Sequence, residues 1–151
     1  MSRSLVVACA NQALGQAFVR AREGISVLSD ARFEASLPCS DLQRAKSFYA
    51  EKLGLIPSDE GPAGAFYAGR GGTRFILFPS SGSASGSHSQ MGFMVADITA
   101  EVRDLRQRGV QFEDYDFPGF DKATGIADVG GTRAAWFKDS EGNLLGLVEG
   151  P

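Results

Sequence analysis

Two oxygen-bearing side chains, Glu34 and Gln90, hold the same place in two copies of one sequence pattern, 56 residues apart. A carboxylate can act as a general base when apolar neighbours remove its solvation and raise its pKa. Glu34 is therefore the candidate for abstracting a proton next to a carbonyl group. The alternative for Glu34 is an ion pair with an arginine, because Arg74 and Arg133 lie on neighbouring expected strands.

The repeat is longer than a solenoid unit and shorter than most domains, which indicates two copies of one supersecondary module in a single domain. In the first copy, a strand over residues 32–39 leads to a helix over residues 42–52. Asp41 suits the N-cap of this helix, and Gly54 suits the left-handed position after it. The strand face expected to pack on the helix carries Ala35, Leu37 and Cys39.

The second copy repeats this pattern from Gln90 into a helix capped by Asp97 or Thr99. Each copy reads β-α-β-β-β, with further strands expected over residues 65–68, 73–78, 110–112, 133–138 and 144–148. Residues 113–132 form a long irregular segment without a counterpart in the first copy. A loop of this length in a compact domain is typical of a lid or a binding loop.

Composition excludes several classes of function. A chain of 151 residues with 43% hydrophobic residues suits one globular domain. The net charge of −3 gives no case for binding nucleic acid or an anionic membrane. No apolar run approaches the roughly 20 residues of a membrane span. The only cysteines, Cys9 and Cys39, make no disulfide framework, so we expect a reducing compartment and a cytoplasmic protein.

The expected domain boundaries follow from the repeat. Residues 1–30 are an N-terminal extension, and residues 31–151 are the domain. The first module covers about residues 31–80, a Ser- and Gly-rich linker covers residues 80–89, and the second module covers about residues 90–149. The extension is predicted to be an amphipathic helix, because one helical face carries Val7, Ala10, Leu14, Ala17 and Ala21.

Two motifs carry a family resemblance over residues 32–149. One is the strand–helix pattern of Leu37, Asp41, Phe48-Tyr49 and Leu53-Gly54, and the other is the turn of Phe137, Asp139, Gly142 and Asn143. Together with the two modules, they resemble the vicinal oxygen chelate superfamily of glyoxalase I, bleomycin-resistance proteins and extradiol dioxygenases. The resemblance implies an α+β fold whose two tandem β-α-β-β-β modules form an open barrel-like cup with the helices outside. It also implies a homodimer.

The resemblance further implies four cup-facing metal positions, which fall on Glu34, Leu77, Gln90 and Gly146. A leucine cannot ligate a metal and a glycine has no side chain, while a catalytic divalent cation takes at least three protein ligands. We therefore expect no metal and no other cofactor. The alternative is a reduced metal site of Glu34, Gln90 and His88, the only histidine. The Ser-rich surroundings of His88 favour an exposed linker residue instead of a metal ligand.

Three functions stay open. The first, which the resemblance favours, is a metal-free binding protein of the glyoxalase/bleomycin-resistance type for a small organic molecule. Its walls would be Phe75, Leu77, Tyr115, Phe117, Phe120, Trp136, Gly146 and Val148, and its polar contacts Glu34, Ser36 and Gln90. The second is a lyase, isomerase or dioxygenase-type enzyme that uses Glu34 as base or the reduced metal site. The third is an interface protein that binds another subunit through residues 1–30 and 113–132.

Overall fold

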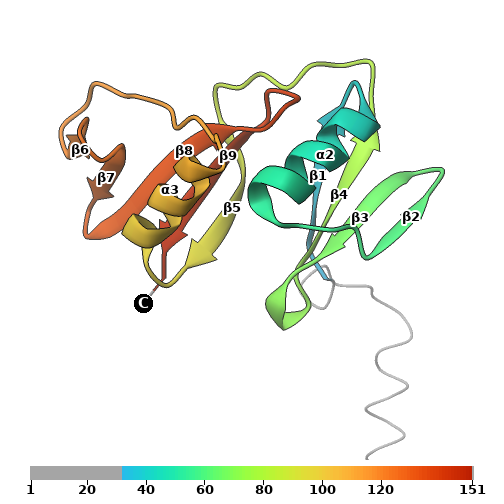
Figure 1. The fold of residues 1–151 in the computed structure, drawn as a ribbon, viewed down its shortest axis with the longest axis horizontal. Coiled ribbons are helices and arrows are strands. Elements are labelled where there is room, and N and C mark those ends of the chain that lie inside the picture. Colours follow the sequence, from blue (N-terminus) through green and yellow to red (C-terminus); the bar gives the residue numbers. More distant parts are fainter. Residues whose placement is uncertain (1–31, 151) are drawn as a thin grey trace, which may run out of the picture. The chain divides into compact units, whose positions relative to one another are not determined.

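The computed structural model describes residues 32–150 (Figure 1). The expected helix of residues 1–30 lies outside the described residues. The first module consists of β1 (Glu34–Cys39), α2 (Leu42–Leu53), β2 (Asp59–Gly61), β3 (Gly64–Ala68), a 3-10 turn η2 (Arg70–Gly72) and β4 (Arg74–Pro79). The second consists of β5 (Ser89–Val95), α3 (Ile98–Gln107), β6 (Phe120–Asp121), β7 (Ile126–Val129), β8 (Thr132–Lys138) and β9 (Leu144–Glu149).

Each module forms one sheet with the same strand path. The first sheet has the order β1-β4-β3-β2, and the second has the order β5-β9-β8-β7-β6. In both, the first strand pairs in parallel with the last strand, and the other neighbours are antiparallel. The expected α+β fold of two β-α-β-β-β modules is confirmed, and the second module has one additional strand, β6.

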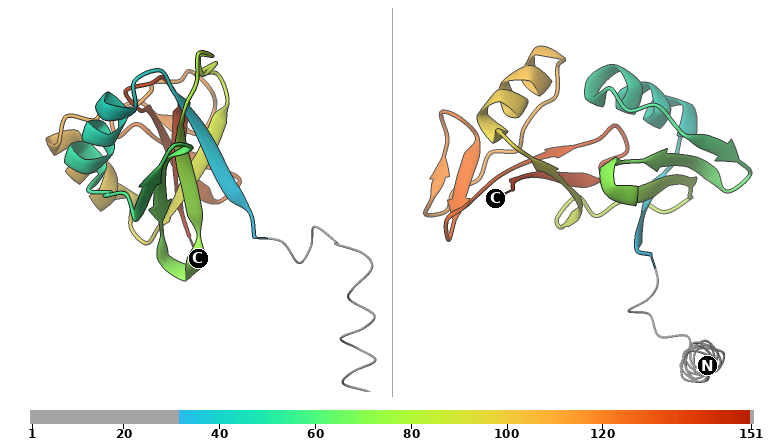
Figure 2. Two further views of the ribbon diagram at one scale, coloured as in Figure 1. Left: turned by 90° about the vertical axis from the view of Figure 1, so that its right-hand side faces the viewer. Right: turned by 90° about the horizontal axis from the view of Figure 1, so that it is seen from below.

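The helices begin and end where the sequence predicts. The Asp41 side chain accepts a hydrogen bond from the backbone N–H of Arg44, and Gly54 follows α2 with a φ of 69°. Of the two candidates for the cap of α3, Asp97 is the one that accepts from the backbone N–H of Ala100. Each helix covers one face of its own sheet (Figure 2). No helix among residues 32–150 has the length and hydropathy needed to cross a membrane.

One hydrophobic core contains residues of both modules. Leu37 and Cys39 of β1 are buried in it, as the alternation of that strand predicts. In the first module the rings of Tyr67 and Phe75 stack 4.6 Å apart, and Tyr49 of α2 lies 5.5 Å from each of them. This packing places α2 on the face of the first sheet that carries Tyr67 and Phe75.

The turn between β8 and β9 joins the second module to the first. The buried Asp139 carboxylate accepts hydrogen bonds from the Tyr49 hydroxyl at 3.0 Å and from the Asn143 side-chain amide at 2.8 Å. The same amide donates to the Pro38 carbonyl at 3.0 Å. Burial, and then the Asp139 charge, raise the pKa of Tyr49 well above its ordinary value, so this hydroxyl remains a donor.

A second carboxylate of this turn, Glu141, binds the N-terminal end of α2. It accepts from the backbone N–H groups of Ser40 and Asp41 and from the guanidinium of Arg44. Burial alone would raise the pKa of Glu141, but the Arg44 guanidinium and these N–H groups outweigh burial and lower the pKa to about 2. The charged carboxylate is also favoured by the helix dipole.

The structure differs from the strand predictions at three places. The strand over residues 110–112 was a wrong prediction, because only Phe112 pairs there, in a single bridge to Phe137. Residues 113–132 are not irregular throughout, since they contain β6 and β7, which join the second sheet. Strand β2 went unnoticed because its sequence, Asp-Glu-Gly, has residue types that are depleted in strands.

Candidate functional site

The face of each sheet that its helix leaves uncovered is called its open face here. Side chains alternate between the two faces of a strand. On β9, Leu145 and Leu147 lie in the core, so Gly146 lies on the open face. Gly146 pairs with Gly92 of β5 on one side and with Trp136 of β8 on the other. Two of these three adjacent residues thus have no side chain.

The indole of Trp136 lies over Gly146. A Cβ added to Gly146 would be 3.4 Å from Oγ of Ser89 and 3.5 Å from Cδ1 and Nε1 of the indole, so the side chains of Ser89 and Trp136 cover this glycine. A Cβ added to Gly92 would have only the Gly146 carbonyl oxygen at 3.8 Å and a Val148 methyl at 4.0 Å as neighbours. The sheet surface beside the Trp136 ring is therefore free of side chains at Gly92.

Four of the residues predicted to bind a ligand form one aromatic cluster, Tyr115, Phe117, Phe120 and Trp136. Tyr115 is central, with ring centroids 6.0 Å from Phe117, 5.8 Å from Phe120 and 5.6 Å from Trp136. The rings of Phe120 and Trp136 meet that of Tyr115 edge to face, at 88° and 86°. Burial, and then the Glu113 charge, raise the pKa of Tyr115, so its hydroxyl stays protonated.

The β6–β7 hairpin holds the cluster in place. Phe120 on β6 pairs with Ala127 on β7, which pairs with Ala134 on the same face as Trp136. Before Phe120, the chain crosses β7 closely at Gly119, which has a φ of 94°. A Cβ at Gly119 would lie 2.5 Å from the Asp128 carbonyl oxygen. Only glycine fits there, so Gly119 fixes where the loop aromatics lie.

The first module presents a different set of residues at the equivalent place. Ser36 of β1 pairs with Ile76 of β4, which pairs with Phe66 of β3. Ile76 is therefore the counterpart of Gly146. The family resemblance had placed Leu77 there, but Leu77 is fully buried in the core and faces away from the open face. The expected position was therefore wrong by one residue, and a shift of one residue along a strand moves a side chain to the opposite face of the sheet. Phe75 is likewise a core residue.

Glu34 lies at the exposed end of β1, and its carboxylate is 3.9 Å from Nε of Arg74. The two residues are direct partners in the parallel pairing of β1 and β4. The Arg74 guanidinium also lies over the ring of Phe66, 5.4 Å from its centroid. Arg133, the other possible partner, pairs with Glu149 instead. Glu34 thus has the arginine partner that was the alternative to a desolvated base.

The donors of the family's metal positions do not fit a divalent cation. Within residues 32–150 there is no group of three or more His, Cys, Asp or Glu side chains able to hold a metal ion. Gln90 and His88 are exposed, and His88 precedes β5, so the expectation of an exposed linker histidine is confirmed.

The sequence reasoning missed Gly92 and Ile76 as residues of the open faces. Gly92 follows Gln90 by two residues, so strand alternation places both on one face. Gly92 is also at the offset of the repeat from Ser36, a predicted binding residue. Either signal could have identified Gly92. Ile76 required the register of β4 against β1, which the sequence does not contain.

Comparison with known proteins agrees with this fold. A sequence model described as the Glyoxalase/Bleomycin resistance protein/Dioxygenase superfamily matches residues 32–147. The chain is 28% identical over 130 residues to the uncharacterized protein YurT of Bacillus subtilis (strain 168), covering 76% of this chain and 94% of that protein.

Solved structures of other proteins share this fold. A member of this superfamily from Sphaerobacter thermophilus DSM 20745 has a TM-score of 0.63 and 24% identity, with 82% of this chain and 100% of the other covered. TnmS3, an antibiotic binding protein from Streptomyces sp. CB03234, has a TM-score of 0.56 and 25% identity, with 86% and 100% covered. With the family match spanning most of the described domain, the chain belongs to the glyoxalase/bleomycin resistance protein/dioxygenase superfamily.

Proposed function

We propose that this protein binds a small aromatic molecule on the open face of its second sheet, without a divalent metal. The observation that carries the proposal is the cluster of four aromatic rings whose Trp136 indole lies over Gly146, next to the surface at Gly92 that has no side chain. A planar ring fits against such a surface and meets Trp136 and Tyr115 at its sides. The likeness to an antibiotic-binding protein supports a small-molecule ligand.

The open face of one chain supplies limited affinity. Two ring contacts contribute about 1 kcal/mol each, and burial of about 100 Å² of apolar surface adds roughly 2.5 kcal/mol. The sum of about 4.5 kcal/mol corresponds to a dissociation constant of about 0.5 mM. Tighter binding needs a second wall over the ligand, so we propose that a second copy of the chain provides it in a homodimer. Met94, with 67% of its surface exposed on this face, is an apolar residue such a dimer would cover.

An enzyme that uses Glu34 as a general base is the other function under consideration. The ion pair of Glu34 with Arg74 is partly exposed and supplies no apolar enclosure around the carboxylate. The geometry therefore supports binding better than catalysis. A Glu34→Gln variant separates the two functions, because turnover would collapse without the base whereas binding to the aromatic cluster of the second sheet would not.

The chain contains one tryptophan, so its fluorescence reports directly on the proposed site. The wild type would be titrated with naphthalene, anthraquinone and their hydroxylated derivatives, and we expect saturable quenching of Trp136. Gly92→Val fills the open surface without backbone strain, and we expect at least tenfold weaker binding. The matched control is Ser36→Val, the same residue at the equivalent strand position of the first module, which should bind as the wild type does. Equal affinity in all three proteins would overturn the proposal.

A further inference from the structure

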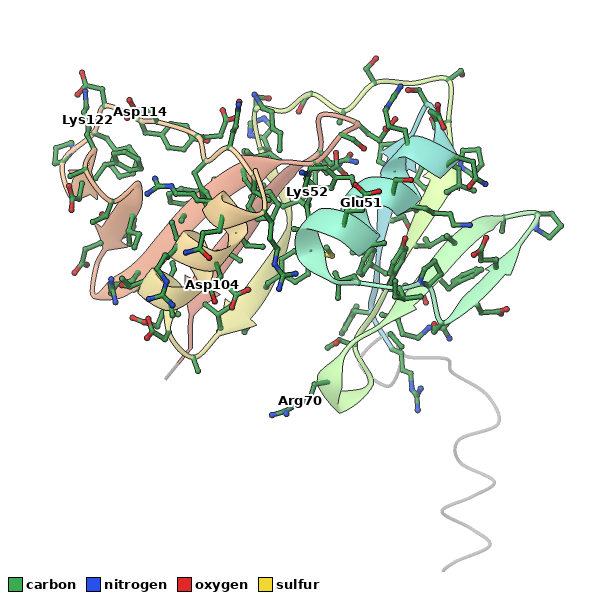
Figure 3. The ribbon with its side chains drawn as sticks, in the orientation of Figure 1. Glu51, Lys52, Arg70, Asp104, Asp114 and Lys122 are labelled. Atoms are coloured by element: carbon green, nitrogen blue, oxygen red, sulfur yellow. The ribbon has the colours of Figure 1, made fainter. Side chains whose placement is uncertain are left out.

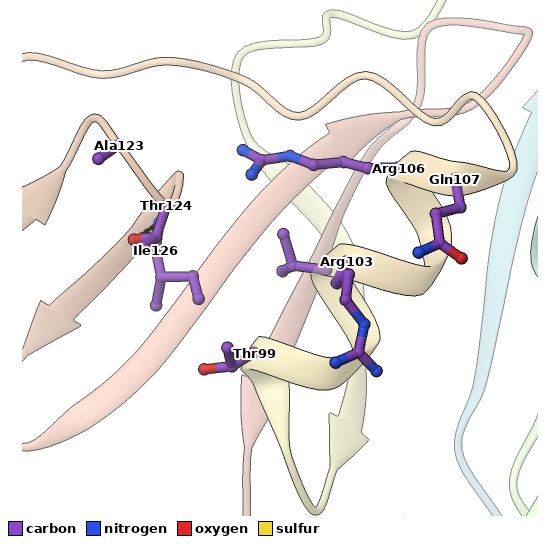
Figure 4. A pocket seen from close by; sticks show the side chains of 8 residues that line it. Thr99, Arg103, Arg106, Gln107, Ala123, Thr124 and Ile126 are labelled. Carbon is purple, nitrogen blue, oxygen red and sulfur yellow. Dashed lines mark hydrogen bonds between the residues drawn. The ribbon is translucent and has the colours of Figure 1, made fainter.

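One pocket of the second module lies on the face of the sheet that α3 covers, between α3 and the turn of the β6–β7 hairpin (Figure 4). Its volume is about 460 Å³, which is within the range of small-molecule sites. Trp136 and its aromatic partners lie on the opposite face of the same sheet. The pocket is thus separate from the aromatic site, and an inference drawn from it does not depend on the proposed function.

The floor of the pocket is apolar. Val102 of α3 and Ile126 of β7 line it, and both are core residues with 2% and 6% of their surface exposed. Ala123 of the hairpin turn adds a methyl group at the edge. A ligand that enters this space therefore removes apolar surface from water, and the ligand needs an apolar part to match.

Arg106 supplies a cation at one end of the pocket. Its guanidinium extends from α3 towards the hairpin turn (Figure 4) and lies 5.6 Å from the centroid of the Phe112 ring. A Cβ added at Gly125 would be only 2.6 Å from its Nη2, so the absence of a side chain at Gly125 makes room for it. No carboxylate of residues 32–150 forms a salt bridge with Arg106.

Two neighbouring polar groups, unlike Arg106, already have hydrogen-bonded side-chain partners among the described residues. Arg103 also lines the pocket, but its Nε already donates to the Asp104 carboxylate at 3.0 Å. At the other end, the Thr99 hydroxyl oxygen accepts from the Arg133 guanidinium at 2.7 Å, which leaves the Thr99 hydroxyl hydrogen free to donate. Thr99 and Arg106 are seven positions apart on α3, which corresponds to about 10 Å along the helix axis.

We propose that this pocket binds a small organic acid with an apolar body of about one ring. Its carboxylate pairs with the planar guanidinium of Arg106, whose donors match the two carboxylate oxygens. Its ring lies on Val102 and Ile126, and a polar group at its far end reaches the Thr99 hydroxyl. A single anionic group suffices, because Arg106 is the cation of the described pocket that lacks an acidic partner.

Benzoate is the probe, and benzamide is its neutral counterpart of the same shape. With the full-length ¹⁵N-labelled protein, we expect benzoate to shift the backbone amide signals of Thr124, Gly125 and Ile126 in a saturable manner. Benzamide should bind at least tenfold more weakly, because a charge-assisted hydrogen bond contributes about 1.5–3 kcal/mol. Raising the salt concentration should weaken benzoate binding, because this arginine is exposed.

Arg106→Gln should lower the affinity for benzoate about tenfold or more. The control is Arg108→Gln, which removes the same charge from the same end of α3, where the guanidinium approaches Gly54 instead. Arg108→Gln should bind benzoate as the wild type does, and the melting temperature of both variants would be measured to confirm folding. Equal binding of benzamide, equal loss in both variants, or shifts confined to the signals around Trp136 would each overturn the proposal. The last result would instead assign benzoate to the aromatic site.

Discussion

The open faces of the two sheets follow the same strand path and present different chemistry. In the first sheet, three adjacent strands contribute Ser36, Ile76 and Phe66, with the Glu34–Arg74 ion pair nearby. In the second sheet, the equivalent strands contribute Gly92, Gly146 and Trp136. The first copy carries side chains on all three strands, whereas the second carries two glycines beside the Trp136 indole. The two copies thus keep the same strand path while their open faces differ, and the second is the one proposed to bind a ligand.

The aromatic rings on the second open face come largely from a segment that only the second module contains. It runs from Glu113 to the turn before β7 and adds β6 to the edge of the sheet. On the open face it brings Tyr115, Phe117 and Phe120 to Trp136. On the helix-covered face its turn forms one wall of the pocket that contains Arg106. Figure 3 labels Asp114 and Lys122 on this segment of the second module, and it shows Arg70 projecting from the short η2 turn of the first module.

The largest expected effect concerns the β8–β9 turn and its first-module equivalent, the η2 turn. Asp139→Ala leaves the Tyr49 hydroxyl, the Asn143 amide and two backbone N–H groups without their buried acceptor. We expect a loss of about 3–5 kcal/mol in the free energy of unfolding, measured by urea denaturation. Thr73→Ala removes an exposed hydroxyl that bonds to the Arg70 carbonyl and should cost less than about 1 kcal/mol. Similar losses in the two variants would mean that the turns are equivalent.

The next largest effect is expected from glycine substitutions at the edge of each sheet. Gly119→Ala introduces a Cβ 2.5 Å from the Asp128 carbonyl oxygen at a φ of 94°, so the β6–β7 hairpin must shift. We expect a loss of about 2 kcal/mol and weaker quenching of Trp136 by aromatic ligands. Gly61→Ala at the edge of the first sheet meets no atom within 4 Å and should leave both quantities unchanged. If Gly119→Ala weakened stability but not binding, the hairpin would not be what positions the aromatic cluster.

Acid is expected to weaken the contact between the modules at Glu141. Its folded pKa of about 2 is below the ordinary value of 4.5, so its contribution is present above pH 4.5 and is lost as the pH falls towards 2. Glu141→Gln should therefore be less stable than the wild type by about 1–2 kcal/mol at pH 7, and the two should converge near pH 2. Urea denaturation at a series of pH values measures this difference, and a gap that stays constant with pH would contradict the assignment.

The smallest effect is expected at Glu34. Its ion pair with Arg74 is long and partly exposed, and such pairs contribute about 0–1 kcal/mol. Glu34→Gln should change the melting temperature little and leave aromatic binding within about twofold of wild type, because Glu34 lies on the first sheet. A large loss of binding would place the ligand on the open face of the first sheet instead.

Local chemistry in the sequence was enough to predict most of the fold. Asp41 and Gly54 begin and end α2 because their side-chain and backbone preferences act within a few residues, and Asp97 does the same for α3. The alternation of Leu37 and Cys39 identified the buried face of β1 for the same reason. The short strand β2 and the hairpin of β6 and β7 could not be predicted in this way, because their pairing partners rather than their own residues hold them in the sheets.

The sequence by itself determined that the chain has two equivalent modules, and it singled out aromatic residues in a segment present in only one of them. Only the tertiary structure decided which residues share an open face. Leu77 is buried and Ile76 is not, because the register of β4 against β1 is set by packing over the whole sheet. The structure likewise brought Arg74 to Glu34 and left Arg106 without an acidic partner among the described residues. Both outcomes depend on contacts between segments distant in the chain, which local sequence preferences do not specify.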